Sequence, residues 1–89
     1  MITCKRCRVA GRVQGVSYRY ATRQKALGLG VCGYARNLED GSVDVLACGD
    51  TEAVNSLCQW LSVGPALARV THVQCEDHDV IRESDFVIG

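Results

Sequence analysis

The sequence has no apolar segment long enough to cross a bilayer, and it has few residues that interrupt regular structure. Proline occurs once, and only 6% of the residues are aromatic. The longest uncharged run, residues 53–68, contains Asn55, Gln59 and the break Gly64-Pro65, so it is too short and too interrupted to span a membrane. No basic-then-apolar leader ends in a small-residue cleavage site. We therefore expect a cytoplasmic protein that makes no membrane contact.

Internal repeats, linkers and low-complexity segments are also absent. The chain has 89 residues, of which 47% are hydrophobic, and this apolar content excludes intrinsic disorder. A chain of this length is sufficient for one compact core. We expect residues 1–89 to form a single domain and the protein to be a monomer.

Acidic residues are missing from the first 36 positions, although the formal net charge of the whole chain is zero. All of the charged residues in this part are basic: Lys5, Arg6, Arg8, Arg12, Arg19, Arg23, Lys25 and Arg36. The remainder carries ten acidic residues against Arg69 and Arg82. The positive charge of residues 1–36 therefore favours the binding of anions. Two interpretations remain open: a functional anion site, or a fold that pairs the charges of the two parts on its surface.

Cysteine, in contrast, is abundant, with six residues in a short chain. This count leaves the redox compartment open, because a domain this apolar can bury a core without disulfides. Cys4 and Cys7 form a C-x-x-C pair, but no second pair or suitably spaced histidine completes a set of four ligands. On a strand, a spacing of three places the two thiols on opposite faces. We therefore expect no metal site at this pair.

Hydrophobic periodicity divides the chain into alternating strands and helices. The predicted elements are a strand at residues 2–13, a helix at 17–29, strands at 31–38 and 42–48, a helix from 50 or 51 to 63, and strands at 68–76 and 85–88. Asp40-Gly41 suits a hairpin turn between two strands. Val70 and Val73 differ in parity, which implies a bulge or twist in their strand.

The order β-α-β-β-α-β, followed by a terminal strand, predicts an α+β fold of the ferredoxin-like, split βαβ type. In this sandwich two crossover helices cover one face of an antiparallel sheet, and the third strand lies between the first and the second. Many functions occur on this scaffold, so the site needs a separate argument.

The loop from Gly11 to Ser17 joins the first strand to the first helix. Gly11 and Gly15 allow the main chain to curl so that its amides converge, and the helix N-terminus adds partial positive charge. The loop is therefore a candidate cradle for a tetrahedral anion, and Arg19 can add a guanidinium fork that matches phosphate oxygens. The alternative is a tight turn beside a solvated arginine.

Asn37 ends a strand that runs parallel to the first strand in this fold, so it lies at the same edge of the sheet as the loop. Its neutral amide can hold a water molecule beside a bound phosphoryl group. Alternatively, it stabilises the approach to the Asp40-Gly41 turn. Arg36 alternates to the opposite face, where we expect it to be solvated.

The sequence Gly11-Arg12-Val13-Gln14-Gly15-Val16-Ser17-Tyr18-Arg19 resembles the acylphosphatase family, and the resemblance covers nearly the whole chain. The other matching blocks are Leu29-Gly30-Val31-Cys32-Gly33, Arg36-Asn37, Asp40-Gly41, Cys48-Gly49, Gly64-Pro65-Ala66-Leu67-Ala68-Arg69-Val70 and Phe86-Val87-Ile88. The resemblance implies the ferredoxin-like fold, the hydrolysis of small acyl phosphates, a water-positioning Asn37 and a phosphate-binding Arg19. It also implies a phosphate-binding loop made of Gly11, Arg12, Val13, Gln14, Gly15, Val16 and Ser17. Tyr18 replaces the usual phenylalanine, so its hydroxyl needs a partner or a route to solvent.

The implied reaction needs little chemical machinery. An acyl phosphate releases a carboxylate whose conjugate acid has a pKa of about 4, so no strong general acid is required. The sequence has no P-loop lysine and no carboxylate cluster near the loop, so we expect no nucleotide, metal or other cofactor. His72 and His78 lie outside the expected site.

Two other functions fit the same scaffold. An RNA-recognition domain needs stacking aromatics on the central strands, and residues 42–48 have none, so we expect no nucleic-acid partner. A domain that binds a small regulatory ligand remains an alternative.

Cys4 and Cys48 are candidates for a disulfide. Antiparallel pairing of the first and third strands brings the start of one near the end of the other, with both thiols on the parity opposite the apolar face. We expect Cys7, Cys32, Cys58 and Cys75 to be small packing residues.

Overall fold

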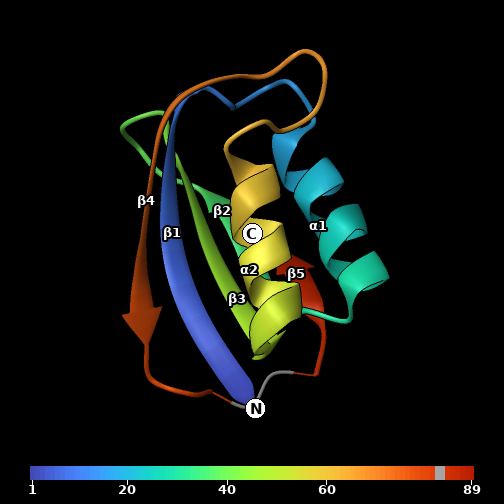
Figure 1. Ribbon diagram of the computed structural model, residues 1–89. Coiled ribbons are helices and arrows are strands. Elements are labelled where there is room, and N and C mark those ends of the chain that lie inside the picture. The colour runs from blue at the N-terminus through green and yellow to red at the C-terminus, as the bar shows by residue number, and fades with distance from the viewer. Residues whose placement is uncertain (82–83) are drawn as a thin grey trace.

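The computed structural model places two helices on one face of a five-stranded sheet (Figure 1). The structure describes residues 1–81 and 84–89. The helices are α1 (Tyr18–Leu29) and α2 (Thr51–Leu61). The strands are β1 (Ile2–Arg12), β2 (Cys32–Asn37), β3 (Val43–Asp50), β4 (Arg69–His78) and β5 (Phe86–Ile88). The predicted ferredoxin-like α+β fold is confirmed, and the predicted bounds agree to within about two residues, the usual uncertainty of element ends.

The strand order is β4-β1-β3-β2-β5. As predicted, β3 lies between β1 and β2 and is antiparallel to both, so β1 and β2 run in the same direction. The strands β4, β1, β3 and β2 form the predicted antiparallel sheet, and β5, whose pairing the sequence left open, extends it in parallel with β2. The reason is topological: β4 runs antiparallel to β1 and ends beside its start. A strand that begins near that end of the sheet must run in the direction of β1 and β2.

The hydrophobic core lies between the sheet and the helices. Alternate residues of the strands face the helices, and each helix contributes a stripe spaced by three or four residues. The sequence predicts a helical stripe at Tyr18, Thr22, Ala26 and Leu29, and α1 buries the first three of these residues. The buried hydrophobic residues of this cluster are Cys7, Val9, Val13, Tyr18, Ala26, Val31, Ala35, Val43, Val45, Ala47, Val54, Leu57, Leu61 and Phe86. No helix within residues 1–81 and 84–89 has the length and hydropathy needed to cross a membrane.

The pairing of β1 with β4 is irregular where β1 approaches its end. Ala10 pairs with His72 and Gly11 pairs with Val70, so Thr71 is an extra residue on β4. This shift confirms the irregularity predicted from the parity of this strand. The bulge lies next to the loop that follows β1, and it changes the direction in which the chain leaves the sheet.

The cysteines form two disulfides, one on each face of the sheet. Cys4 lies opposite Cys48 on β3 and is bonded to it, which confirms the predicted pair. The expectation that Cys7 and Cys75 only fill space was wrong, because the two residues lie opposite each other on β1 and β4 and are also bonded. Cys32 and Cys58 are free.

The open face of the sheet, away from the helices, carries an ion-pair network around Asp44. The Asp44 carboxylate is buried and accepts hydrogen bonds from Nε of Arg6 at 3.0 Å and Nε of Arg36 at 3.1 Å. Arg36 lies on the predicted face with about half of its side chain exposed, but sequence reasoning missed its ion pair with Asp44. Residues from the basic front part of the chain pair here with an acid from the remainder, because the fold places β3 between β1 and β2.

Candidate active site

The loop between β1 and α1 contains two residues in the left-handed region of backbone space. Gly15 has a φ of 75° and Ser17 has a φ of 62°. Ser17 occupies the N-cap position of α1, yet its side chain makes no capping hydrogen bond. A residue other than glycine with this backbone conformation is uncommon, and such strain concentrates at functional sites.

The main-chain amides of this loop are available to a ligand. Within residues 1–81 and 84–89, no main-chain hydrogen bond has the amide of Gly15, Val16 or Ser17 as its donor. These amides directly precede α1, whose own first N–H groups have no partner inside the helix. The helix end adds partial positive charge at the same place. The local structure therefore suits the binding of an anion.

Arg19 lies in the first turn of α1 and is half-buried. Its Nη1 donates a hydrogen bond to the carbonyl oxygen of Gly89. The amide of Gly89 in turn donates to the carbonyl oxygen of Ala35 on β2, at 2.9 Å. The guanidinium is thus oriented by the residue that follows β5, beside the end of β2. A hollow of about 230 Å³ adjoins it, lined by the loop, the start of α1 and Ile88.

Gln14 joins the loop to the turn between β2 and β3. Its Nε2 donates to the carbonyl oxygens of Leu38, at 2.8 Å, and Ser42, at 2.9 Å. Sequence reasoning placed Gln14 in the loop but missed this side-chain contact. The sequence contains no signal for it, because the contact depends on the turn lying directly behind the loop.

Asn37 is the last residue of β2 and has an exposed side chain. It directly precedes Leu38, whose carbonyl accepts the hydrogen bond from Gln14. Arg19 is linked through Gly89 to Ala35, two residues before Asn37. The structure therefore brings the loop, Arg19 and Asn37 to one edge of the sheet.

A second hollow of about 560 Å³ lies on the other side of the loop. It is lined by Arg12, Gly15, Val16 and the segment at residues 66–69. Figure 1 shows this segment, which follows α2, beside the loop that follows β1. Arg12 and Arg69 lie opposite each other at the end of the β1–β4 pairing. Sequence reasoning had assigned no role to Arg69.

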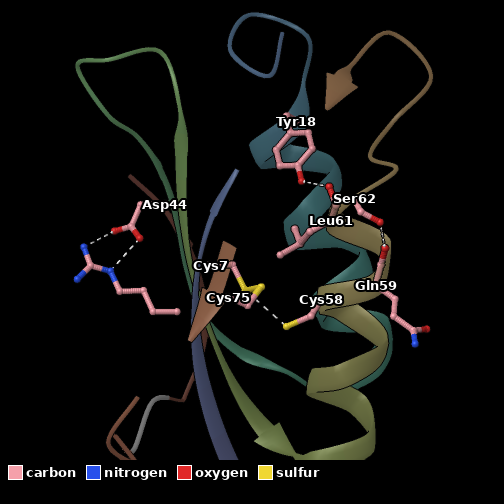
Figure 2. The surroundings of a disulfide bond; sticks show 9 residues. Cys7, Tyr18, Asp44, Cys58, Gln59, Leu61, Ser62 and Cys75 are labelled. Carbon is pink, nitrogen blue, oxygen red and sulfur yellow. Dashed lines mark hydrogen bonds and ion pairs between the residues drawn. A yellow bond between two sulfur atoms is a disulfide. The ribbon is translucent and has the colours of Figure 1, made fainter. Parts of the chain in front are cut away.

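Tyr18 supports the loop from the core side. Its hydroxyl donates to the main-chain oxygen of Leu61 at 2.6 Å, so the buried hydroxyl has a partner and needs no route to solvent (Figure 2). Burial raises the pKa of Tyr18, so the hydroxyl remains a donor at neutral pH.

Potential metal ligands gather elsewhere. In the part of the chain that the structure describes, the side chains close enough together to share an ion are those of Cys7, Cys58 and Cys75. They lie between the sheet and α2 and include no residue of the loop.

Comparison with known proteins identifies the family. The family model described as acylphosphatase matches residues 5–88. An acylphosphatase of Halorhodospira halophila is 54% identical over 94% of this chain and 91% of its own length, and one of Chromohalobacter salexigens is 51% identical over 97% and 96%. The solved structure of an acylphosphatase from Coxiella burnetii is 39% identical, covers 99% of this chain and 93% of its own, and has a TM-score of 0.95. These matches show that the chain belongs to the acylphosphatase family of hydrolases.

Proposed function

We propose that this chain hydrolyses the mixed anhydride of small acyl phosphates to a carboxylate and phosphate. In this proposal the loop amides and Arg19 bind the phosphoryl group, and Asn37 positions the attacking water. The observation that carries the proposal is the run of amides at Gly15, Val16 and Ser17, which have no main-chain acceptor in the described part of the chain, with the Arg19 guanidinium at the same end of α1.

Phosphate binding follows from the donors available at this end of α1. The amides point fixed dipoles at a bound anion, and Arg19 adds a charged donor. In the transition state of phosphoryl transfer, charge is spread over the equatorial oxygens of the phosphoryl group. Donors fixed in place before the reaction stabilise that charge without rearrangement, so these groups lower the barrier as well as bind the substrate.

Asn37 supplies the second requirement, an oriented water. The in-line reaction needs the water oxygen on the side of phosphorus opposite the leaving carboxylate. The Asn37 side chain is exposed at the same edge of the sheet as the loop. Its amide oxygen can accept a hydrogen bond from one O–H of the water. A phosphoryl oxygen of the substrate can take up the proton that the water loses as it attacks phosphorus.

The leaving group explains why no further catalyst is needed. The departing carboxylate is the conjugate base of an acid with a pKa of about 4, so it leaves without a proton from the protein. A simple phosphate ester releases a much more basic alkoxide and would need a general acid. The proposal therefore restricts the substrate class to acyl phosphates, without selecting among acetyl, carbamoyl and glyceroyl phosphates.

The decisive experiment compares substrates on the purified chain. Acetyl phosphate and carbamoyl phosphate should both be hydrolysed, an alkyl phosphate ester should not, and inorganic phosphate should inhibit competitively. A chelator should leave the rate unchanged. Comparable rates on the acyl phosphates and the ester, or no hydrolysis of any acyl phosphate, would contradict the proposal.

A further inference from the structure

Three cysteines from three different elements converge between the sheet and α2. Cys7 on β1 is bonded to Cys75 on β4, and Cys58 on α2 directs its sulfur towards them (Figure 2). The Sγ atoms of Cys58 and Cys7 are 3.6 Å apart. All three sulfur atoms lie within 4.8 Å of one another. The group therefore forms a compact triangle of sulfur.

The dimensions of this triangle suit a single metal ion once the bridge is reduced. A metal–thiolate bond is about 2.3 Å long, so three sulfurs in a plane around one ion stand about 4 Å apart. The 3.6 Å contact and the 4.8 Å limit bracket that spacing. The Cα atoms of Cys7 and Cys75 are 4.0 Å apart, so rotation of the two side chains, without movement of the strands, is enough to separate their sulfurs.

The surroundings select a soft ion. Among residues 1–81 and 84–89, the cluster contains three sulfur ligands and no carboxylate or imidazole. Thiolates favour Cu(I), whereas structural zinc sites normally take four ligands. Cys7 is buried and Cys58 is half-buried, so these two sulfur ligands are shielded from much of the solvent. Because β4 is an edge strand, Cys75 gives an ion a route from the margin of the sheet.

We propose that Cys7, Cys58 and Cys75 form a three-sulfur site for one Cu(I) ion, which becomes available when the Cys7–Cys75 disulfide is reduced. A dithiol reductant supplies the two electrons: it becomes a cyclic disulfide, the bond between Cys7 and Cys75 breaks, and each sulfur gains a proton. Cu(I) then replaces the three thiol protons, which pass to solvent. The site is separate from the loop and does not depend on the proposed hydrolysis.

The test uses the full chain, reduced under anaerobic conditions and freed of reductant. Cu(I) is titrated against a chromophoric Cu(I) chelator, and X-ray absorption gives the number of sulfur ligands. Cys32→Ser is the matched control, because Cys32 is the other free cysteine and lies opposite Cys48 rather than in this cluster. Wild type and Cys32→Ser should hold one Cu(I) in a three-sulfur shell. Cys58→Ser should lower the affinity for this Cu(I) ion at least ten-fold. X-ray absorption should then show two sulfur ligands around the ion.

An unchanged affinity and three-sulfur shell in Cys58→Ser would overturn the proposal, as would equally weak binding by all three proteins. Cys58→Ala guards against a folding defect caused by a buried hydroxyl. Cu(I) should raise the melting temperature of reduced wild type and Cys32→Ser, because a ligand that binds only the folded state stabilises it. The same rise in Cys58→Ala would contradict the assignment.

Discussion

The hydroxyl of Tyr18 donates to the main-chain oxygen of Leu61 at 2.6 Å and so joins the first residue of α1 to the last residue of α2. The Tyr18 ring also stacks on Trp60, with 6.0 Å between the ring centres. Tyr18 directly follows Ser17, the strained residue that ends the loop. The C-terminal turn of α2 therefore holds Tyr18 in place, and with it the end of the loop that precedes α1.

Tyr18→Phe should lower the free energy of unfolding by about 1 kcal/mol, the usual net contribution of one hydrogen bond. The ring keeps its packing, while the carbonyl of Leu61 loses its buried donor. Urea denaturation measures the change. Tyr20→Phe is the control, because Tyr20 is exposed on the same helix and should change nothing. Equal midpoints for both variants would show that the Tyr18 hydrogen bond does not stabilise the fold.

Arg19→Ala should reduce kcat for acetyl phosphate by about 10³-fold or more, the range found for arginines that stabilise charge in phosphoryl transfer. Arg19→Lys should restore little, because an ammonium group lacks the planar fork. Arg23→Ala is the control, since Arg23 lies one turn later on α1 and donates to the carbonyl of Phe86 at 3.0 Å. Near wild-type turnover in Arg19→Ala would remove Arg19 from the site.

Asn37→Ala should lower kcat by about 10²-fold and leave the inhibition constant of inorganic phosphate unchanged, because the proposed role concerns the water and not the anion. Steady-state kinetics with phosphate as inhibitor separates the two effects. Asn55→Ala, at an exposed position of α2, is the control. If Asn37→Ala weakens phosphate binding and spares kcat, its role is in binding.

The sequence predicted those features that depend on local periodicity. The apolar stripe that contains Tyr18 and Ala26 predicted α1, since helical spacing alone decides which face is buried. The parity of Cys4 and Cys48 predicted their disulfide, because antiparallel pairing of β1 with β3 follows from the fold. The edge position shared by Arg19 and Asn37 was predicted for the same reason.

Features that depend on exact register were not predictable. The partner of Cys7 is determined by how β4 pairs with β1, and the bulge at Thr71 shifts that pairing. The pairing of Arg36 with Asp44 depends likewise on the register of β2 with β3. The contact between Arg19 and Gly89 depends on a parallel β5, which the order of the elements leaves open.

Asp44→Asn should destabilise the protein by about 2 kcal/mol at pH 7, because Arg6 and Arg36 lose a charged acceptor. Burial tends to raise the pKa of Asp44, but the hydrogen bonds and charges of these arginines outweigh it and hold the pKa below its ordinary value. A lowered pKa stabilises the folded state above the unfolded pKa of about 3.9, and this stabilisation is lost as the pH falls further.

The difference between wild type and Asp44→Asn should therefore shrink as the pH falls below about 4, where the protonated carboxyl resembles the amide. Urea denaturation at pH 7 and pH 3 gives both values. Asp77→Asn, at an exposed position of β4, should differ little from wild type at either pH. A difference for Asp44→Asn that is the same at both pH values would contradict the contribution of the charge.

Gly11→Ala should destabilise the protein by about 3 kcal/mol, the upper range for local backbone strain. Gly11 has a φ of 124°, and a Cβ there would lie 2.2 Å from the main-chain oxygen of Arg69 and 2.8 Å from the amide nitrogen of Thr71. Both atoms belong to the main chain of β4, one at the bulge and one two residues before it, so they cannot move without disturbing the pairing of β1 with β4. Gly15→Ala separates this clash from backbone strain, because Gly15 also has a positive φ but nothing within 4 Å of its would-be Cβ. Gly15→Ala should lower the free energy of unfolding by only about 1 kcal/mol. Urea midpoints that fall equally in the two variants would show that the close approach at Arg69 is not what requires glycine.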